Sequence, residues 1–212
     1  MAVGYTQYDT YRVSTGVMAP TLKPGQLTLV EPGGDGIPAR GDVIILDGEH
    51  WPGVPATQVF VLRVIAVGGD RVACCDPDGR IILNGEPLVE PYASGPSDTH
   101  GQFELTVPDG RIFVLGDERD RARDSRVLLT EGASGTAGDV AVRATLPANA
   151  RLGRVLTVIV PPWQLHHVSA GGGASLHYLV LAAVGIGLAL FLAGACMQGH
   201  LLIVSRGKRD PS

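Results

Sequence analysis

Residues 59–83, VFVLRVIAVGGDRVACCDPDGRIIL, decide the fold class of this chain. They contain three short runs rich in Val, Ile and Leu, namely Val59–Val67, Arg71–Cys75 and Ile81–Leu83. Between the last two runs, the turn residues DPDG at 76–79 predict a hairpin. Runs of this length and composition, bounded by turn signals, predict β-strands.

The same pattern of short apolar runs and turns continues outward in both directions. Further strands are predicted at Gln26–Glu31, Asp42–Leu46, Phe103–Val107, Ile112–Leu115, Val140–Leu146 and Val155–Val160. No segment before residue 175 shows a sustained helical period, and the 29 glycines and 15 prolines favour many turns. We therefore predict a mainly-β domain, a sandwich or barrel, over residues 14–165, preceded by a short N-terminal lead at residues 1–13.

Composition and motifs exclude several classes of function. The formal net charge is −4 and no basic patch occurs, so no nucleic-acid partner is expected. The chain has neither a CxxC nor an HExxH pattern, and we predict neither a metal site nor a cofactor. Cys74, Cys75 and Cys196 are interpreted as free thiols, because a disulfide between adjacent cysteines needs a geometry far from the usual Cα separation.

A second part of the chain is typical of a membrane anchor. Residues 179–197 read LVLAAVGIGLALFLAGACM and carry no charge. As a helix they would be about 28 Å long, close to the ~30 Å hydrocarbon core of a bilayer. A buried core helix, the competing interpretation, seldom stays apolar on every face over this length. We predict one transmembrane helix within residues 176–204, joined to the domain by a glycine-rich linker at residues 166–175.

Flanking charge predicts the orientation of this anchor. The basic tail, residues 205–212, carries Arg206, Lys208 and Arg209, whereas the 20 residues before Leu179 contain no lysine or arginine. The positive-inside rule therefore predicts a single-pass protein of the cell membrane, with its C-terminus in the cytoplasm and its β domain outside. Residues 1–16 contain no apolar segment that would start export, so a tail-anchored protein with its domain in the cytoplasm remains the alternative.

Four segments, in chain order, resemble sequence boxes of the type I signal peptidases, which are membrane-bound Ser/Lys proteases that remove signal peptides. They are TGVMAPTLKPG at 15–25, RGDVI at 40–44, LRVIAVGGD at 62–70 and GDERDRARDSR at 116–126, with NGEPLVEPY at 84–92 between the last two. The resemblance implies a β-rich catalytic domain held at the outer membrane surface. It also implies a substrate bound as an extended strand, with small side chains at the cleavage site.

The resemblance places the family's catalytic groups on residues that cannot perform its chemistry. That chemistry needs a serine hydroxyl as nucleophile and a neutral lysine as base. Here the nucleophile position is Val17, the lysine position is Leu62, and the position of the serine that supports the lysine is Ala122. Only the oxyanion-side position, Thr15, keeps a hydroxyl. Lys23, the one lysine before the predicted anchor, lies in a turn that we expect to be exposed.

Other matched positions are expected to keep binding or structural roles. The resemblance implies peptide binding at Met18 and Pro20, and structural support from Arg63, Asp117, Asp124 and Arg126. The competing interpretation of the charged run at residues 117–126 is a solvated loop, with ion pairs of little net value.

The pattern of loss indicates an inactive relative. Removing one member of a buried polar cluster leaves its partner unsatisfied at a cost of ~1–3 kcal/mol, whereas replacing all members by apolar groups can be nearly neutral. We therefore predict an inactive signal-peptidase-like protein that binds extended peptides, signal peptides among them, or assists an export or processing complex. One alternative is an active signal peptidase whose nucleophile is Ser14 or Thr15. Another is an accessory subunit that pairs with an active peptidase through small residues at Gly185, Ala189 and Ala193.

Overall fold

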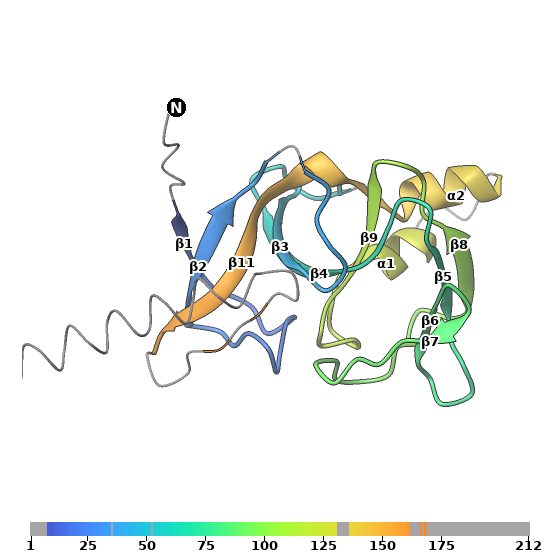
Figure 1. Cartoon of the computed structure of the whole chain (residues 1–212), viewed down its shortest axis with the longest axis horizontal. Helices are drawn as coiled ribbons and strands as arrows, with labels where there is room; N and C mark the ends of the chain where they lie inside the picture. The colour runs from blue at the N-terminus through green and yellow to red at the C-terminus, as the bar shows by residue number, and fades with distance from the viewer. Residues whose placement is uncertain are drawn as a thin grey trace, which may run out of the picture. The chain divides into compact units, whose positions relative to one another are not determined.

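The computed structural model describes residues 8–34, 36–51, 53–130, 136–161, 166 and 168, all within one unit, Met1–Gly171. Two sheets with antiparallel pairing make up this unit (Figure 1). One sheet has seven strands in the order β1-β2-β11-β3-β4-β9-β10, and the other has four in the order β7-β6-β5-β8. The prediction of a mainly-β domain is confirmed.

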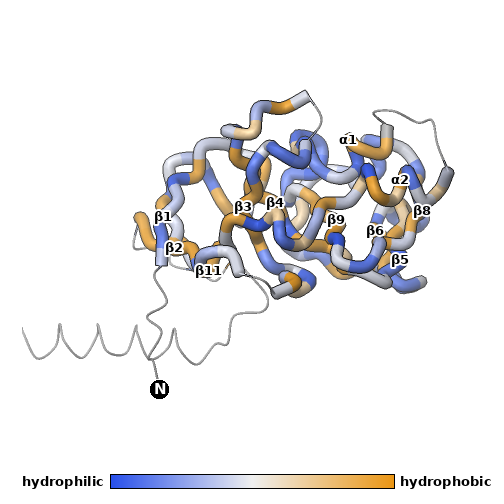
Figure 2. The backbone as a smooth tube through the Cα atoms, turned by 90° about the horizontal axis from the view of Figure 1, so that it is seen from above, coloured by the Kyte–Doolittle hydropathy of each residue, from blue (hydrophilic) through white to orange (hydrophobic). Residues whose placement is uncertain are grey.

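The larger sheet joins strands from both ends of the described chain. Its strands are β1 (Asp9–Arg12), β2 (Leu27–Pro32), β3 (Val43–Asp47), β4 (Val59–Val67), β9 (Arg111–Leu115), β10 (Leu146–Pro147) and β11 (Arg151–Val160). β4 lies between β3 and β9 (Figure 2). Its side chains enter apolar clusters on both faces of the sheet. Leu62 and Val64 belong to one cluster with Ile44. Val61 belongs to another with Val43, and burial on both faces explains the continuous apolar run of this strand.

The smaller sheet contains the predicted hairpin. Its strands are β5 (Arg71–Cys74), β6 (Ile81–Leu83), β7 (Glu86–Pro87) and β8 (Phe103–Thr106). β5 pairs with β6 through Val72 and Leu83, and Gly79 has a φ of +78° in the turn between them, a conformation that glycine adopts without strain. Phe103 of β8 packs against Phe113 of β9, with ring centroids 5.6 Å apart, and so joins the two sheets.

The predicted strand at Val140–Leu146 is wrong. The described helices are α1 (Ser125–Thr130), α2 (Ala137–Arg143) and the short 3-10 helix η1 (Ala148–Ala150). A capping box starts α2: the Thr136 hydroxyl accepts a hydrogen bond from the Asp139 N–H, and the Asp139 carboxylate accepts one from the Thr136 N–H. This box satisfies backbone donors that a helix N-terminus otherwise leaves without partners, so a helix forms where the apolar alternation alone indicated a strand.

Cys74 and Cys75 form a disulfide, so their interpretation as free thiols is wrong. The peptide bond between them is cis, and their Cα atoms lie 3.0 Å apart. Cys196 lies outside the described residues.

The predicted membrane helix at residues 176–204 also lies outside the described residues, together with the basic tail at residues 205–212 and most of the linker at residues 166–175. Within the part of the chain that the structure describes, no helix has the length and apolar character needed to cross a bilayer.

Candidate functional site

A pocket of about 160 Å³ lies between the N-terminal segment, the first half of β4 and the loop that follows β9. The N-terminal segment contributes residues 11, 13–15, 17 and 18 to its lining, β4 and the residue before it contribute residues 58–62, and the loop contributes Arg121 and Arg123. The pocket therefore joins three parts of the chain that are far apart in the sequence.

On its β4 side, this pocket has a strand edge that none of the described strands covers. β3 pairs with β4 from Val59 to Arg63, whereas β9 pairs with β4 only from Arg63 onward. The N–H and C=O of Val64 bond to the segment that leads into β3. Successive residues of an antiparallel strand direct these groups to alternate sides, so those of Val59 and Val61 face the side on which β9 has ended. An extended peptide could pair with this edge by strand addition.

The structure places the three predicted catalytic positions around this pocket. Val17 and Leu62 both line it, and Ala122 lies between the two arginines of its lining. A Cβ atom on Gly116 would lie 2.2 Å from the Ala122 Cβ and 2.8 Å from the Val17 carbonyl oxygen, so both residues pack against this glycine. Leu62 is only 1% exposed and belongs to the apolar cluster that contains Ile44.

Gly116→Ala is expected to destabilise the domain and distort the pocket. The added methyl group would overlap the Ala122 side chain, and overpacking of this kind typically costs ~1–3 kcal/mol. Gly138→Ala is the matched control, because its Cβ would meet only the Thr136 hydroxyl at 3.8 Å and would give α2 a better helix former. Urea unfolding of the full-length variants measures both effects, and equal stability of the two would contradict the close packing around Gly116.

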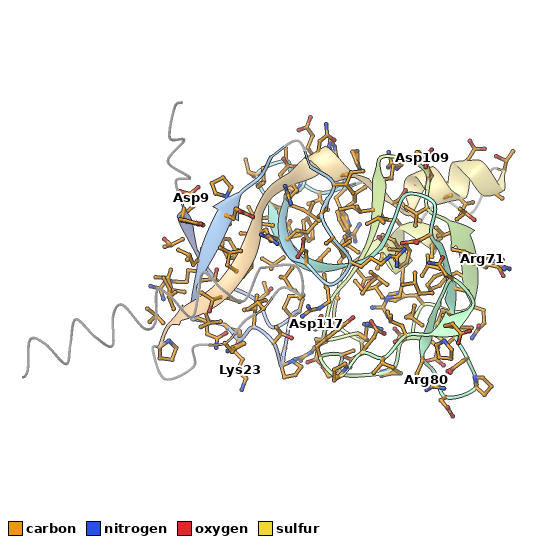
Figure 3. All side chains as sticks on the ribbon, viewed as in Figure 1. Asp9, Lys23, Arg71, Arg80, Asp109 and Asp117 are labelled. Atoms are coloured by element: carbon orange, nitrogen blue, oxygen red, sulfur yellow. A yellow bond between two sulfur atoms is a disulfide. The ribbon has the colours of Figure 1, made fainter. Side chains whose placement is uncertain are left out.

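The described lining of the pocket holds hydroxyls but no proton acceptor for them. Tyr11, Ser14 and Thr15 supply the hydroxyls, and the described lining contains no His, Lys, Asp or Glu. Its arginines stay protonated in proteins and cannot act as bases. Lys23 is exposed and lies outside the lining, with its side chain directed away from the ribbon (Figure 3). His100, whose pKa is lowered by burial and by a nearby guanidinium, also lies outside the lining.

A buried ion pair joins β4 to the loop after β9. Arg63 donates to both carboxylate oxygens of Asp117, at 2.8 and 2.7 Å, and the two side chains are 4% and 1% exposed. The Thr21 hydroxyl donates to the same carboxylate. The Arg63 guanidinium also lies 4.0 Å from the centroid of the Tyr92 ring, whose pKa is raised by burial and by the Glu90 charge. Bidentate pairing of this kind fixes geometry as well as charge, so it holds the start of the loop.

A second buried pair holds the far end of the same loop. Arg126 donates to both oxygens of Asp124, at 3.0 and 2.7 Å, and neither side chain is exposed. Asp124 also accepts a hydrogen bond from the Gly116 N–H at 3.1 Å. Arg119, fully buried as well, pairs with Glu90 and donates to the Gly116 carbonyl at 3.0 Å. Four of the eight ionisable side chains of the charged run, Asp117, Arg119, Asp124 and Arg126, are therefore buried. Asp124 and Arg119 hold Gly116 through both of its backbone groups, so the interpretation of the run as a solvated loop is wrong.

Sequence reasoning missed three arginines of this loop. Arg119 lies in the fourth matched segment, residues 116–126, and this place in the segment could have indicated its structural role. For Arg121 and Arg123, nothing in the sequence indicates that they line the pocket. Of the two predicted peptide-binding residues, Met18 is buried and lines the pocket, whereas Pro20 is exposed and lies outside the lining. Among the residues that the structure describes, no group of three or more His, Cys, Asp or Glu is arranged to hold a metal ion.

Comparison with known proteins finds relatives over most of the described chain. The family model described as Signal peptidase, peptidase S26, matches residues 1–159. Signal peptidase I of Bacillus licheniformis is 32% identical over 130 residues, which cover 56% of this chain and 66% of that protein. Probable signal peptidase I-1 of Synechocystis is 35% identical over 118 residues, which cover 52% of this chain and 57% of that protein. The matched region thus spans less than two thirds of the length of either relative.

A solved structure of a signal peptidase I from Enterococcus faecalis also aligns with this protein. The alignment covers 57% of this chain and 97% of that chain, at 26% identity and a TM-score of 0.40. The match to the family model extends over more than half of the chain and includes all three predicted catalytic positions. The chain therefore belongs to the type I signal peptidase family, peptidase S26.

Proposed function

We propose that this protein is a membrane-anchored signal peptidase homologue that binds extended peptides without cleaving them. The observation that carries the proposal is the pocket lining, in which Val17 and Leu62 are present and no described residue can accept a proton from a hydroxyl. Serine-type hydrolysis requires a nucleophile beside such a base. Because the positions that would hold these two groups are both aliphatic, the pocket keeps a place for a peptide but lacks the means to cut it.

Peptide binding is supported by two strand edges at the pocket. β1 is an edge strand of the larger sheet, and its residue Tyr11 contributes to the lining. On the other side, the open part of β4 presents the backbone groups of Val59 and Val61. An added peptide strand gains affinity from such backbone groups, and small pockets for alternate side chains supply specificity. A volume of about 160 Å³ leaves room for a side chain of the bound peptide, since a cavity of about 150 Å³ holds a molecule as large as benzene.

The membrane anchor and its orientation are part of the proposal. The apolar segment at residues 179–197 and the basic tail after it support a single-pass protein with a cytoplasmic C-terminus and an external domain. At that surface the domain could hold signal peptides, or it could assist an active signal peptidase in an export or processing complex.

A second candidate function is proteolysis with Ser14 or Thr15 as the nucleophile. Both side chains are exposed and line the pocket, which favours this candidate over any nucleophile elsewhere in the described residues. The described lining offers neither hydroxyl a base, so binding without cleavage is the function that the geometry supports best.

The full-length protein in detergent is expected to bind a fluorescent signal peptide and to leave it intact. Val59→Pro should weaken binding by about three- to tenfold, because it removes one N–H donor from the open edge, whereas Val59→Ala keeps that donor. Fluorescence anisotropy measures the binding and mass spectrometry detects cleavage. Clean cleavage after a small residue, abolished by Ser14→Ala or Thr15→Val, would establish the active alternative instead. Absence of binding would contradict the proposal.

A further inference from the structure

We propose that the pocket selects the free C-terminal carboxylate of a peptide, so that its ligand is a peptide already released by hydrolysis. The inference rests on the proposed function, which is peptide binding along the open edge of β4, and it adds the chemical class of the ligand. Two features of the described residues support it, namely a strand edge that is blocked at one end and two arginines of the blocking loop that line the pocket.

The open edge of β4 ends where β9 begins to pair. Leu115, the last residue of β9, pairs with Arg63, so Gly116 leaves the strand beside Leu62. The Glu118 N–H donates to the Val17 carbonyl at 3.0 Å and ties the loop to the N-terminal segment. A peptide strand added beside residues 59–62 is therefore blocked beyond Leu62 along this edge, and its extended part has to stop there.

Two arginines in the loop that blocks this edge, Arg121 and Arg123, line the pocket. Ala122, which lies between them in the sequence, packs against Gly116. The described lining contains no Asp or Glu, although the chain as a whole has a formal net charge of −4. The guanidinium fork matches the two oxygens of a carboxylate, and charge-assisted hydrogen bonds of this kind are stronger than those to neutral groups. The pocket is thus complementary to a negative group.

The direction of the peptide follows from this charge. A peptide that runs parallel to β4 pairs with Val59 and Val61 and brings its C-terminus to Leu62, where the extended path stops. Its last side chain would then enter the pocket beside Val17, and its α-carboxylate would reach the arginines. A side-chain carboxylate fits less well, because it would have to share the pocket with the aliphatic groups of Val17, Met18 and Leu62.

A ligand with this terminus is a product of peptide-bond hydrolysis. In that reaction water adds to the carbonyl carbon and the C–N bond breaks, so the N-terminal fragment leaves with a carboxylate and the other fragment leaves with an amine. The described lining of this pocket holds no base for that step. The reaction that supplies the ligand must therefore be carried out by a separate peptidase, and this protein would act after it.

The test compares peptides that share one sequence and differ at the C-terminus. An N-terminally labelled apolar peptide that ends in alanine with a free carboxylate is expected to bind the full-length protein in detergent about tenfold more tightly than its C-terminal amide. Arg121→Gln should bring this affinity ratio close to one, because it weakens the binding of the free-acid peptide only. Arg123→Gln should also reduce the ratio. Higher salt should weaken the binding of the free-acid peptide more than the binding of the amide peptide. Fluorescence anisotropy gives all of these affinities.

Arg71→Gln is the matched control. Arg71 pairs with Glu104 on the smaller sheet, outside the pocket lining, and Figure 3 shows it at the outer side of that sheet. This variant removes the same charge and should keep the tenfold ratio, while thermal unfolding confirms that each variant is folded. A third peptide, amidated and ending in aspartate, separates a side-chain carboxylate from the terminal one.

Each alternative result has a definite meaning. If the amidated aspartate peptide binds as tightly as the free acid, the selection is for a side chain and the proposal is overturned. Equal affinity for acid and amide also overturns it, but leaves the proposed peptide-binding function in place. Failure of every peptide to bind overturns both. A tenfold ratio that survives Arg121→Gln and Arg123→Gln would remove the arginines from the explanation and contradict the proposal.

Discussion

Arg126→Ala is expected to lower the free energy of unfolding by about 3–5 kcal/mol, because it breaks a buried ion pair on one side only. Arg126 is fully buried, and its guanidinium donates to Asp124 and to the backbone carbonyls of Ser97 and Arg119. Alanine leaves the Asp124 charge buried with one hydrogen-bonding partner fewer and two carbonyls without this donor. Urea unfolding of the full-length protein in detergent, followed by circular dichroism, measures the loss.

Arg80→Ala is the matched control for this prediction. Arg80 pairs with Asp76 and Asp78, but its side chain is 48% exposed, and exposed pairs contribute at most about 1 kcal/mol. The double variant Asp124→Ala with Arg126→Ala should cost less than the sum of the two single variants, because the second change removes the charge that the first leaves without its partner. Equal losses for Arg126→Ala and Arg80→Ala would show that the buried network does not hold the loop.

The strands could largely be predicted because burial imposes a visible pattern on them. β4 has apolar clusters on both faces, so its sequence is apolar throughout and its bounds at Val59–Val67 were predicted without error. α2 was missed because the decisive contact is a cap between Thr136 and Asp139, which lies outside the apolar pattern. β1 was missed as well, because its residues, Asp9–Arg12, are mostly exposed and become a strand through pairing with the edge of β2.

The site could be predicted only as far as the matched segments reach. The order of these segments was enough to expect Val17, Leu62 and Ala122 near one another, since related chains fold these segments together. Whether Arg121 and Arg123 line the pocket depends on the path of the loop that follows β9. That path is set by contacts between distant residues, such as the pair of Arg63 and Asp117, which are 54 positions apart. Such contacts leave no local signal in the sequence.

Val17→Ser combined with Leu62→Lys is expected to give slow cleavage of a signal peptide by a protein that otherwise binds it intact. Both positions line the same pocket, but Val17 packs against the cluster that contains Val61, whereas Leu62 belongs to the cluster on the other face of β4. The new lysine therefore has to reach the serine hydroxyl around the open edge of the strand. A positioned general base contributes typically about 10²–10⁴-fold, which is the expected gain over Val17→Ser alone. Mass spectrometry of the peptide products measures the rate. Val17→Ala combined with Leu62→Lys is the matched control and should show no cleavage.

Burial of position 62 is what makes this reactivation plausible. Leu62 is 1% exposed within an apolar cluster, and desolvation lowers the pKa of a lysine placed there, because the charged form is disfavoured. Only the neutral amine accepts the serine proton, so the cleavage rate should rise with pH through that lowered pKa. The lowered pKa of this lysine also affects stability. The free energy of unfolding of the variant is highest above the ordinary lysine pKa of about 10.4, and it decreases as the pH falls toward the lowered pKa. Adding Ala122→Ser should raise the rate further by orienting the amine. Cleavage that persists in the control, Val17→Ala with Leu62→Lys, would instead assign the nucleophile to another hydroxyl of the pocket that acts with the introduced lysine.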